Sequence, residues 1–392
     1  MWDNEKKKKM KICFVTTIHQ SMGWFVADAA KYFHIKGHDV SYVCNMDKAF
    51  VKEHEGYAHC FNVKMERGLR PLSMLTSMYA MYRIFKREKF DCVQYATPNA
   101  SFIASIAACL AGIRYRVYGF WGMRYEGAHG ISRQLLMAFE KITCLLSTHV
   151  RIVSHKNMEI VIKDGICSRE KIGVIGLGGT IGVNTQVYDI GKKKIWRSEI
   201  RAKLGLSEND FVFAFVGRIN ADKGINELIE AFKEVDGKYA NVKLLLLGME
   251  DKVNPVKAEN MDWARKSGNV LMPGAVHKDM VCRYIAASDL LVHPTYREGF
   301  GKIIQEAMSM KLPVITTDVP GPSEVVEENV SGILVPKADV KALVNAMCML
   351  YSDKNLAERI AEAGYRRFSE NFTMEKMVGN IYDEYMRITG LC

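Results

Sequence analysis

The sequence lacks the signals of several classes of protein. Its 392 residues contain no stretch of about twenty apolar residues, the length that a helix needs to cross a bilayer. No cleavage site follows the basic start, M-W-D-N-E-K-K-K-K-M, so we expect no secretory signal peptide. The 10 cysteines are scattered, with no C-x-x-C pair and no Cys/His spacing suited to zinc. We therefore expect a cytoplasmic protein with reduced thiols and no metal site.

A dinucleotide-binding fingerprint is also missing. The expected first strand, residues 11–18, leads into H-Q-S-M-G-W-F rather than G-x-G-x-x-G. That glycine pattern lets a backbone approach a pyrophosphate closely, so its absence disfavours a dehydrogenase.

Positive charge is concentrated in the first half. Residues 1–190 hold 26 Lys and Arg against 16 Asp and Glu, a net charge of +10, whereas residues 191–392 hold 28 of each kind. Such a field attracts anionic lipid or a polyphosphate, at about 1 kcal/mol per basic residue near an anionic surface. Nucleic acid is the competing partner, but the sequence has no recognition motif, zinc knuckle or aromatic-basic RNA signature. We therefore expect an anionic membrane surface as a partner and no nucleic acid.

The chain alternates strand-like and helix-like segments, which favours parallel α/β layers, and its length favours two domains. The polar segment 182–194 is the predicted linker. A last helix is expected over residues 374–388. In the first half, strands are expected at residues 11–18, 40–44, 60–63, 92–97, 115–120, 150–154 and 172–176; in the second, a strand begins at Phe211 and strands end near Gly248, Pro273, Thr295, Thr317 and Val335.

Two glutamates frame the most informative segment, H-P-T-Y-R-E-G-F-G-K-I-I-Q-E-A. An apolar run over residues 290–294 predicts a strand and residues 302–310 have a helical pattern, so Glu298 lies on a strand-to-helix turn. Two glycines and the amino end of a helix favour an anion at this turn. Glu306, inside the helix, suits a vicinal diol such as a ribose, and Glu298 suits a second polyhydroxylated group. The alternative is a solvated Glu298 and a Glu306 that offsets the helix dipole.

Two basic residues follow the strand 211–216, in the segment G-R-I-N-A-D-K-G. Ligands of open α/β sheets bind beyond the carboxyl ends of the strands. Arg218 offers a planar fork and Lys223 a mobile point charge, a pair suited to the two phosphates of a diphosphate. The alternative is a surface loop with ordinary charges.

These motifs resemble the retaining GT-B glycosyltransferases of family 4. In that family a strand followed by G-R and K-G contacts the donor diphosphate, and E-G-F-G to E-A is the other donor signature. The resemblance covers nearly the whole chain. It implies α/β architecture of the GT-B type, with two Rossmann-like domains, residues 1–190 for the acceptor and 191–370 for the donor, that face each other across a cleft. Residues 371–392 are implied to form a helix that crosses back to the first domain.

The resemblance also implies roles for single residues. Arg218, Lys223 and Glu298 are expected to be catalytic. Where the family usually has two adjacent glycines, this chain has Gly321-Pro322. The remaining donor contacts are expected at Gly217, Gly248, Met272, Pro273, Gly274, Gly299, Phe300, Gly301, Glu306 and Gly321, with the nucleobase against a turn at residues 272–274.

The segment from Ser101 to Gly127 resembles bacterial members that build capsule, O-antigen or related glycans on lipid-diphosphate carriers. Many family members have a histidine followed by glycine where this chain has Trp121-Gly122. Downstream, Glu126 is a candidate to orient the acceptor hydroxyl or to accept its proton; a salt bridge to a neighbouring arginine is the competing interpretation. Acceptor-binding candidates are His19, Gly23, Trp121 and Arg124, although a polar turn explains His19 slightly better.

A basic amphipathic helix is expected over residues 72–90, with Leu75, Met78, Tyr82 and Phe85 at helical spacing. Such a helix suits a membrane interface, and Arg67 and Arg70 ahead of it strengthen that interpretation. An apolar stripe that packs into the core is the commoner case.

The sequence thus predicts a retaining, metal-independent hexosyltransferase without a cofactor. It would move a sugar from a nucleoside-diphosphate donor, UDP being favoured, to a hydroxyl of a lipid-diphosphate-linked saccharide in surface-polysaccharide synthesis, at the inner face of the cell membrane. Two alternatives stay open: a nucleotide-sugar epimerase of the same fold, and a non-catalytic basic module that binds glycolipid.

Overall fold

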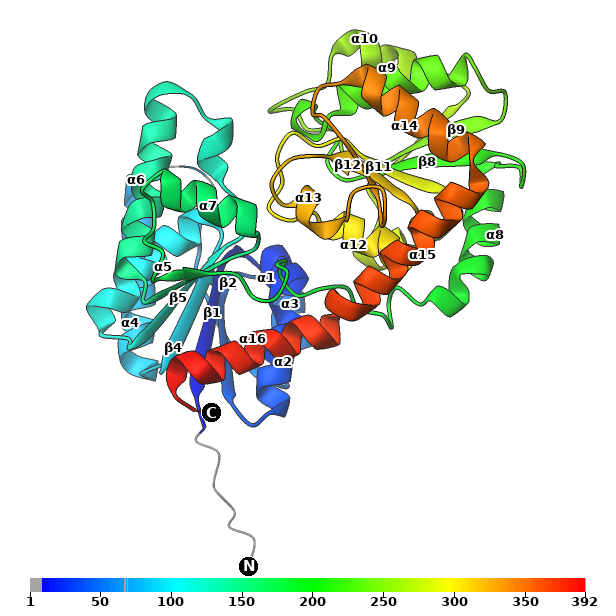
Figure 1. Cartoon of the computed structure of the whole chain (residues 1–392). Coiled ribbons are helices and arrows are strands. Elements are labelled where there is room, and N and C mark those ends of the chain that lie inside the picture. Colours follow the sequence, from blue (N-terminus) through cyan, green and yellow to red (C-terminus); the bar gives the residue numbers. More distant parts are fainter. Residues whose placement is uncertain (1–8, 67, 69, 392) are drawn as a thin grey trace, which may run out of the picture. The chain divides into compact units, whose positions relative to one another are not determined.

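A computed structural model describes residues 9–66, 68 and 70–391. The chain forms two compact units (Figure 1). The first unit holds the residues up to Ile181 and those from Glu375 onward, and the second runs from Gly182 to Met374. The predicted divisions at residues 190 and 370 therefore lie within the second unit. The first eight residues and Arg67, which contributed to the basic-start and membrane predictions, lie outside the described residues.

The first unit is built on a parallel sheet of seven strands in the order β3-β2-β1-β4-β5-β6-β7. Its central strands, such as Cys92–Ala96, are apolar runs buried on both faces, as expected for parallel strands that helices cover on both sides. The seven expected strands are confirmed: β1 Lys11–Ile18, β2 Asp39–Asn45, β3 Ala58–Asn62, β4 Cys92–Ala96, β5 Tyr115–Phe120, β6 His149–Ile152 and β7 Ile172–Gly173.

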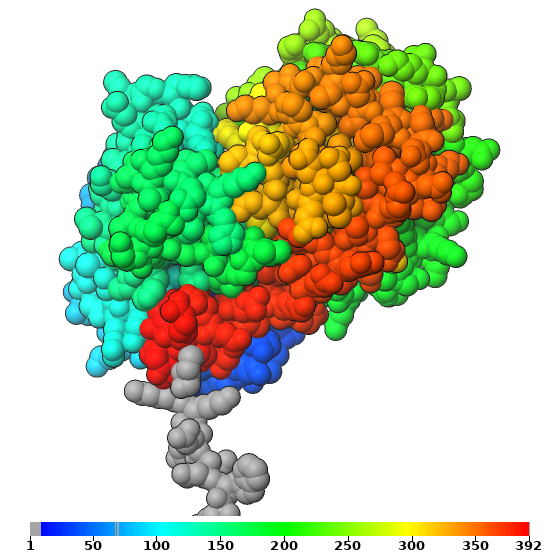
Figure 2. Space-filling view, in the orientation of Figure 1, coloured from blue at the N-terminus to red at the C-terminus, as the bar shows by residue number. Residues whose placement is uncertain are grey.

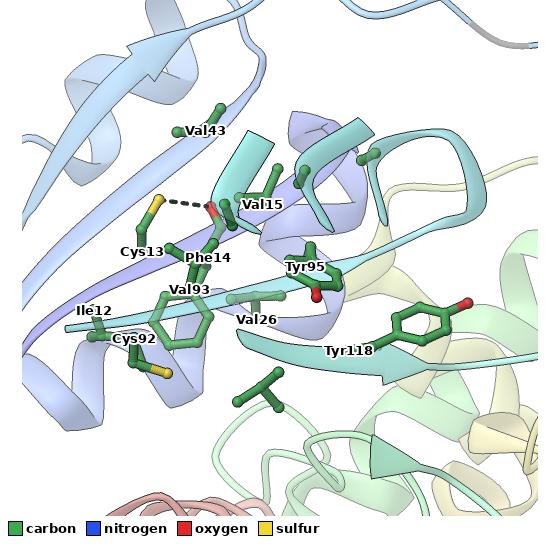
Figure 3. Packing of buried hydrophobic residues seen from close by; sticks show 14 of the residues in the cluster. Ile12, Cys13, Phe14, Val15, Val26, Val43, Cys92, Val93, Tyr95 and Tyr118 are labelled. Carbon is green, nitrogen blue, oxygen red and sulfur yellow. Dashed lines mark hydrogen bonds between the residues drawn. The ribbon is translucent and has the colours of Figure 1, made fainter. Parts of the chain in front are cut away.

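Side chains of β1 and β4 form the centre of the core in this unit. Phe14 and Val15 of β1 lie near Val93 and Tyr95 of β4, with Tyr118 of β5 beside them (Figure 3). Around the sheet lie α1 His19–Phe25, α2 Ala27–Ile35, α3 Lys48–His54, α4 Pro71–Glu88, α5 Pro98–Ala111, α6 Gly130–Leu146 and α7 His155–Lys163.

The last helix, α16 Met374–Thr389, packs on this first sheet, which confirms the predicted return of the chain. Tyr385 donates a hydrogen bond to Gln94 of β4 at 2.5 Å, and Tyr115 of β5 donates to the carbonyl of Thr389 at 3.2 Å. Glu384 forms an ion pair with Arg151 of β6. The other face of the helix stays on the surface, in red in Figure 2.

The second unit holds a parallel sheet of six strands in the order β10-β9-β8-β11-β12-β13. Numbered within the unit, this is the order 3-2-1-4-5-6 of a Rossmann fold, and the first six strands of the other unit share it. The strand order reverses between β8 and β11. The strands are β8 Phe211–Val216, β9 Val242–Leu247, β10 Val270–Gly274, β11 Leu290–His293, β12 Val314–Thr317 and β13 Ile333–Val335, and the helices are α8 Lys193–Leu204, α9 Ile225–Asp236, α10 Ala258–Lys266, α11 Val281–Ala287, α12 Lys302–Ser309, α13 Pro322–Val325, α14 Val340–Ser352 and α15 Lys354–Asn371.

Two local predictions need correction. Residues 190–194 are not an irregular linker, because a short 3₁₀ helix, Ile190–Lys192, leads directly into α8, where Trp196 and Ile200 are buried at helical spacing. Residues 272–274 form the end of strand β10 rather than a turn. Proline is tolerated there because β10 is an edge strand, where one side of the backbone needs no pairing donor.

Across the described residues, we find no helix that is both long and apolar enough to span a bilayer. Helix α4 packs one face into the core and leaves other apolar side chains exposed. Met81 and Phe85 are buried, and Met78 and Tyr82 pack against the core, whereas Leu72, Leu75 and Tyr79 are exposed.

Candidate functional site

Three glycines line the carboxyl ends of neighbouring strands in the second unit. The amide of Gly217, after β8, donates to the carbonyl of Leu247 at 3.0 Å, and the amide of Gly248, after β9, donates to Gly274 at 3.1 Å. A Cβ on Gly248 would lie 1.7 Å from the carbonyl oxygen of Gly217, so only glycine fits. Gly217, Gly248 and Gly274 therefore leave only backbone at these strand ends, at the edge where ligands of such sheets bind.

The loop after β8 is held by a small polar network. The Asn220 side chain accepts a hydrogen bond from the Lys223 amide at 3.0 Å and donates to Asp251 at 3.2 Å. The same Asp251 oxygen accepts a hydrogen bond from Arg218 at 3.0 Å. The Val253 amide, Asn220 and Arg218 lower the pKa of Asp251 below its ordinary value. Asn220 and Asp251 thus fix the two predicted diphosphate ligands, of which Arg218 remains 71% exposed.

This loop is also tied to the loop after β11. Asp222 pairs with Arg297, and its carbonyl accepts a hydrogen bond from the Tyr296 amide at 2.8 Å. A Cβ on Gly224 would lie 2.0 Å from the carbonyl oxygen of Pro294. Because β8 and β11 flank the reversal of strand order, the two loops meet at the switch point, where Rossmann-like sheets bind their ligands.

Lys223 and Glu298 form an ion pair at this point. Burial alone would raise the pKa of Glu298, but Lys223 and the nearby His293 outweigh it and hold this pKa well below its usual range. The carboxylate is therefore charged at neutral pH. The structure brings together two predicted catalytic residues that stand 75 positions apart in the sequence.

His293 is a third member of this cluster that the sequence did not reveal as functional. It ends β11, is 2% exposed, and stacks on Phe215 of β8 with ring centroids 5.7 Å apart. Its Nε2 lies 3.5 Å from Oε2 of Glu298. Burial lowers the pKa of His293, so the ring is neutral near pH 7.

The turn between β11 and α12 has the predicted geometry. Gly301 adopts a φ of 95° immediately before α12. A Cβ on Gly321 would lie 2.7 Å from the Gly299 carbonyl oxygen, so Gly321 packs directly on this turn. Phe300 is buried against Phe372, with ring centroids 5.8 Å apart, so any donor contact of Phe300 falls to its backbone.

Glu306 lies within α12, with its side chain 14% exposed and Lys302 Nζ 4.0 Å away. Burial raises the pKa of Glu306, and Lys302 and the hydroxyl of Tyr188 partly offset the rise. Tyr188 is buried and precedes α8 by only a few residues. Its proximity to Glu306 has no local sequence signal, because the two residues belong to separate segments of the chain.

The acceptor-side candidates of the first unit are more dispersed. His19 begins α1, where its ring lies 3.5 Å from Asp47 and 3.3 Å from the Asn45 carbonyl. Gly23 lies within the same helix, and a Cβ there would meet only ordinary contact with Phe50 at 3.8 Å. These contacts place the His19 ring beside polar groups of the first unit, and position 23 does not require glycine.

Trp121, Arg124 and Glu126 lie on the segment after β5. Trp121 packs on Phe25 with ring centroids 5.2 Å apart. Arg124 and Glu126 belong to a 3₁₀ helix, Arg124–Gly127, and both are exposed. Close to Arg124, the buried Glu140 of α6 accepts a hydrogen bond from Tyr118 at 2.5 Å. Burial raises the pKa of Glu140 to about 7.

Comparison with known proteins agrees with this architecture. Residues 197–367 match the family described as glycosyl transferases group 1, and residues 22–178 match glycosyltransferase family 4. The capsular polysaccharide biosynthesis glycosyltransferase CapM of Staphylococcus aureus is 30% identical over 94% of each chain. The UDP-Gal:alpha-D-GlcNAc-diphosphoundecaprenol alpha-1,3-galactosyltransferase of Escherichia coli is 26% identical over 82% of this chain and 81% of its own.

Solved structures share the fold. The Anabaena protein HepE, crystallised with UDP, superposes with a TM-score of 0.77 at 20% identity, over 96% of this chain and 100% of that one. Both units are thus the Rossmann-like domains of a GT-B glycosyltransferase. The chain belongs to the group 1, family 4 glycosyltransferases.

Proposed function

We propose that this enzyme transfers a sugar, with retention of configuration, from a UDP-sugar to a hydroxyl of a lipid-diphosphate-linked saccharide in surface-polysaccharide synthesis. The observation that carries the proposal is the pairing of Lys223 with Glu298 at the switch point of the second sheet. An ammonium and a carboxylate there provide one partner for a diphosphate and one for sugar hydroxyls. The names of the Staphylococcus and Escherichia relatives support the class of product.

In the proposed reaction, the second unit must assist the departure of a nucleoside diphosphate. Lys223, Arg218 and the amino end of α12 are the groups that would neutralise charge developing on the leaving phosphate. The bond from the anomeric carbon to the phosphate oxygen breaks and a bond to the acceptor oxygen forms on the same face. The acceptor proton passes to the leaving phosphate. No metal ion is required in this scheme, because the two cations and the helix end neutralise the leaving group. We assign the ribose hydroxyls to Glu306.

We assign Glu126 the task of orienting the acceptor hydroxyl. It lies on the exposed 3₁₀ helix after β5, where a soluble or lipid-linked saccharide has access. Replacement by glutamine keeps hydrogen bonding but removes the negative charge, so it should raise the acceptor KM and leave binding of the donor unchanged.

We also propose that the first unit binds anionic bilayers through α4 and α6, which both pack on α5. Apolar side chains are exposed on both helices, Leu72, Leu75 and Tyr79 on α4 and Ile131 and Leu145 on α6. Basic residues Arg83, Lys86 and Arg87 lie on the same α4 helix. Exposed apolar groups beside cations suit the boundary between head groups and acyl chains.

The function is tested by incubating the protein with UDP-, GDP- and ADP-sugars and lipid-diphosphate saccharides, and measuring product mass and anomeric configuration. Addition of one sugar from a UDP donor, with the donor's anomeric configuration, is expected. Conversion of the nucleotide-sugar without an acceptor would instead identify an epimerase. Glycolipid binding without turnover would identify a non-catalytic module.

A further inference from the structure

His293 is buried without the hydrogen bonds that a buried imidazole ordinarily makes. Among the described residues, neither ring nitrogen has a hydrogen-bonding partner. Nε2 lies 3.5 Å from Oε2 of Glu298, which is longer than an ordinary hydrogen bond. Buried polar atoms are nearly always satisfied in native proteins, so an unsatisfied one asks for an explanation. Loose packing does not explain the missing hydrogen bonds, because the ring stacks on Phe215.

The backbone at His293 is rigidly held. Its carbonyl accepts hydrogen bonds from the Thr316 hydroxyl and from the Thr295 amide, both at 2.9 Å. The Thr295 hydroxyl in turn donates to the carbonyl of Arg297, also at 2.9 Å, beside Glu298. The imidazole is therefore held in place 3.5 Å from the Glu298 carboxylate.

Lys223 has two competing demands in the proposed reaction. In the structure its ammonium pairs with Glu298, yet a donor diphosphate needs the same cation. A largely buried carboxylate that loses its counter-charge is strongly destabilised unless another donor replaces it. A neutral imidazole that carries its proton on Nε2 is such a donor.

We infer that His293 is a positioning residue that takes over the Glu298 carboxylate when the donor diphosphate draws Lys223 away. Nε2–H would then donate to Oε2, closing the 3.5 Å contact to ordinary hydrogen-bond length. This exchange would keep Glu298 charged and aimed at the donor-sugar hydroxyls while Lys223 stabilises the leaving group. The inference rests on the proposed donor site and adds a residue that the sequence motifs did not mark.

Three replacements separate the nitrogen from the ring. His293→Phe keeps an aromatic ring on Phe215 without a nitrogen, His293→Gln supplies an amide near the Nε2 position, and His293→Asn supplies one only near Nδ1. We expect kcat with a UDP-sugar to fall about tenfold in the Phe and Asn variants and to return to within about threefold of wild type in the Gln variant. Affinity for UDP should fall in the same order, because the diphosphate of UDP also draws Lys223 away from Glu298.

A Glu298→Gln background shows whether the effect passes through the carboxylate. There, His293→Phe should cause no further loss, because no carboxylate charge remains for His293 to stabilise. Equal losses in the Phe and Gln variants, an undiminished loss in the Glu298→Gln background, or wild-type kcat in His293→Phe would each overturn the inference. Thermal melts confirm that each variant is folded.

The controls keep this result separate from the proposed function. If the wild-type protein neither binds UDP nor turns over a UDP-sugar, the donor-site proposal itself fails. If wild type is active and Lys223→Ala is not, while His293→Phe matches wild type, only the role of His293 fails.

Discussion

The two units share one strand order but organise their switch points differently. In the second unit, Asn220 and Asp251 fix the loop that carries Arg218 and Lys223, and Lys223 meets Glu298 across β8 and β11. In the first unit, Thr17 lies near the end of β1 and Thr97 follows β4, and their hydroxyls are hydrogen-bonded to each other at 2.7 Å. Thr97 holds a φ of 71°, an uncommon value for a residue other than glycine. One switch point thus gathers opposite charges, and the other gathers neutral hydroxyls.

This difference fits a division of labour. A nucleotide diphosphate has a fixed charge pattern, so its site benefits from charges held in fixed positions. Under the proposed function the acceptor is a lipid-linked saccharide, which presents hydroxyls and a membrane anchor, so the first unit would need exposed polar groups and an interfacial surface.

Loss of the Lys223 ammonium should be the most severe change. Lys223→Ala should lower kcat/KM about a thousandfold, because it removes leaving-group stabilisation and leaves Glu298 without its main counter-charge. Steady-state kinetics with a UDP-sugar measure this. The matched control is Lys238→Ala. Lys238 is exposed, and its ion pair with Glu234 is long, at 4.0 Å. Turnover within tenfold of wild type would remove Lys223 from the mechanism.

Disruption of the close glycine packing at the ends of β8 and β9 should lower the stability of the second unit. Gly248→Ala places a Cβ within 1.7 Å of the Gly217 carbonyl oxygen, so it should destabilise the second unit by about 4 kcal/mol. Gly268→Ala, where an added Cβ meets no atom within 4 Å, is the control. Chemical denaturation compares the two variants. Equal stability of the two variants would contradict the close packing of Gly248 on Gly217.

Glu140 should make the first unit sensitive to pH. Its pKa rises on folding from 4.5 to about 7, so the folded state holds the proton more tightly and stability should fall as pH rises through this interval. A pKa rise of this size corresponds to about 3 kcal/mol of stability, which is present below pH 4.5 and lost above about pH 7. Glu140→Gln, which can still accept from Tyr118, should flatten the dependence between pH 5 and 8 in denaturation experiments. An unchanged slope would assign the dependence to other groups.

The smallest expected effect concerns the membrane surface. Leu75→Glu combined with Tyr79→Glu should weaken co-sedimentation with acidic liposomes about tenfold, because it removes two exposed apolar groups and adds negative charge. Val253→Glu, on the most exposed valine of the second unit, serves as control. Binding by wild type should also weaken with salt. Salt-insensitive binding, or none at all, would contradict the proposed surface.

Much of the fold could be predicted because its signals are local. Apolar runs such as residues 211–216 marked the strands, and the turn from Glu298 to Gly301 followed from a strand pattern, two glycines and a helical pattern. The residues that complete the site carry no such signal. Asp251 lies 33 positions from Arg218, and Tyr188 reaches Glu306 from a different segment, so only the folded chain brings them together.

His293 shows most clearly what the sequence alone cannot predict. Within the sequence it is one more residue of an apolar strand, and its meaning arises from burial, from stacking on Phe215 and from its distance to Glu298. The mistaken turn at residues 272–274 has a similar origin, since Pro273 signals a turn unless the strand is known to lie at the edge of the sheet.

The proposed transfer from a UDP-sugar depends on the Lys223–Glu298 pair, and the reaction product shows whether this pair acts. Mass spectrometry of a lipid-diphosphate saccharide incubated with UDP-sugars should show the addition of one sugar by wild type and none by Lys223→Ala at equal protein concentration. An unextended saccharide with every UDP-sugar, or equal extension by the variant, would contradict the account.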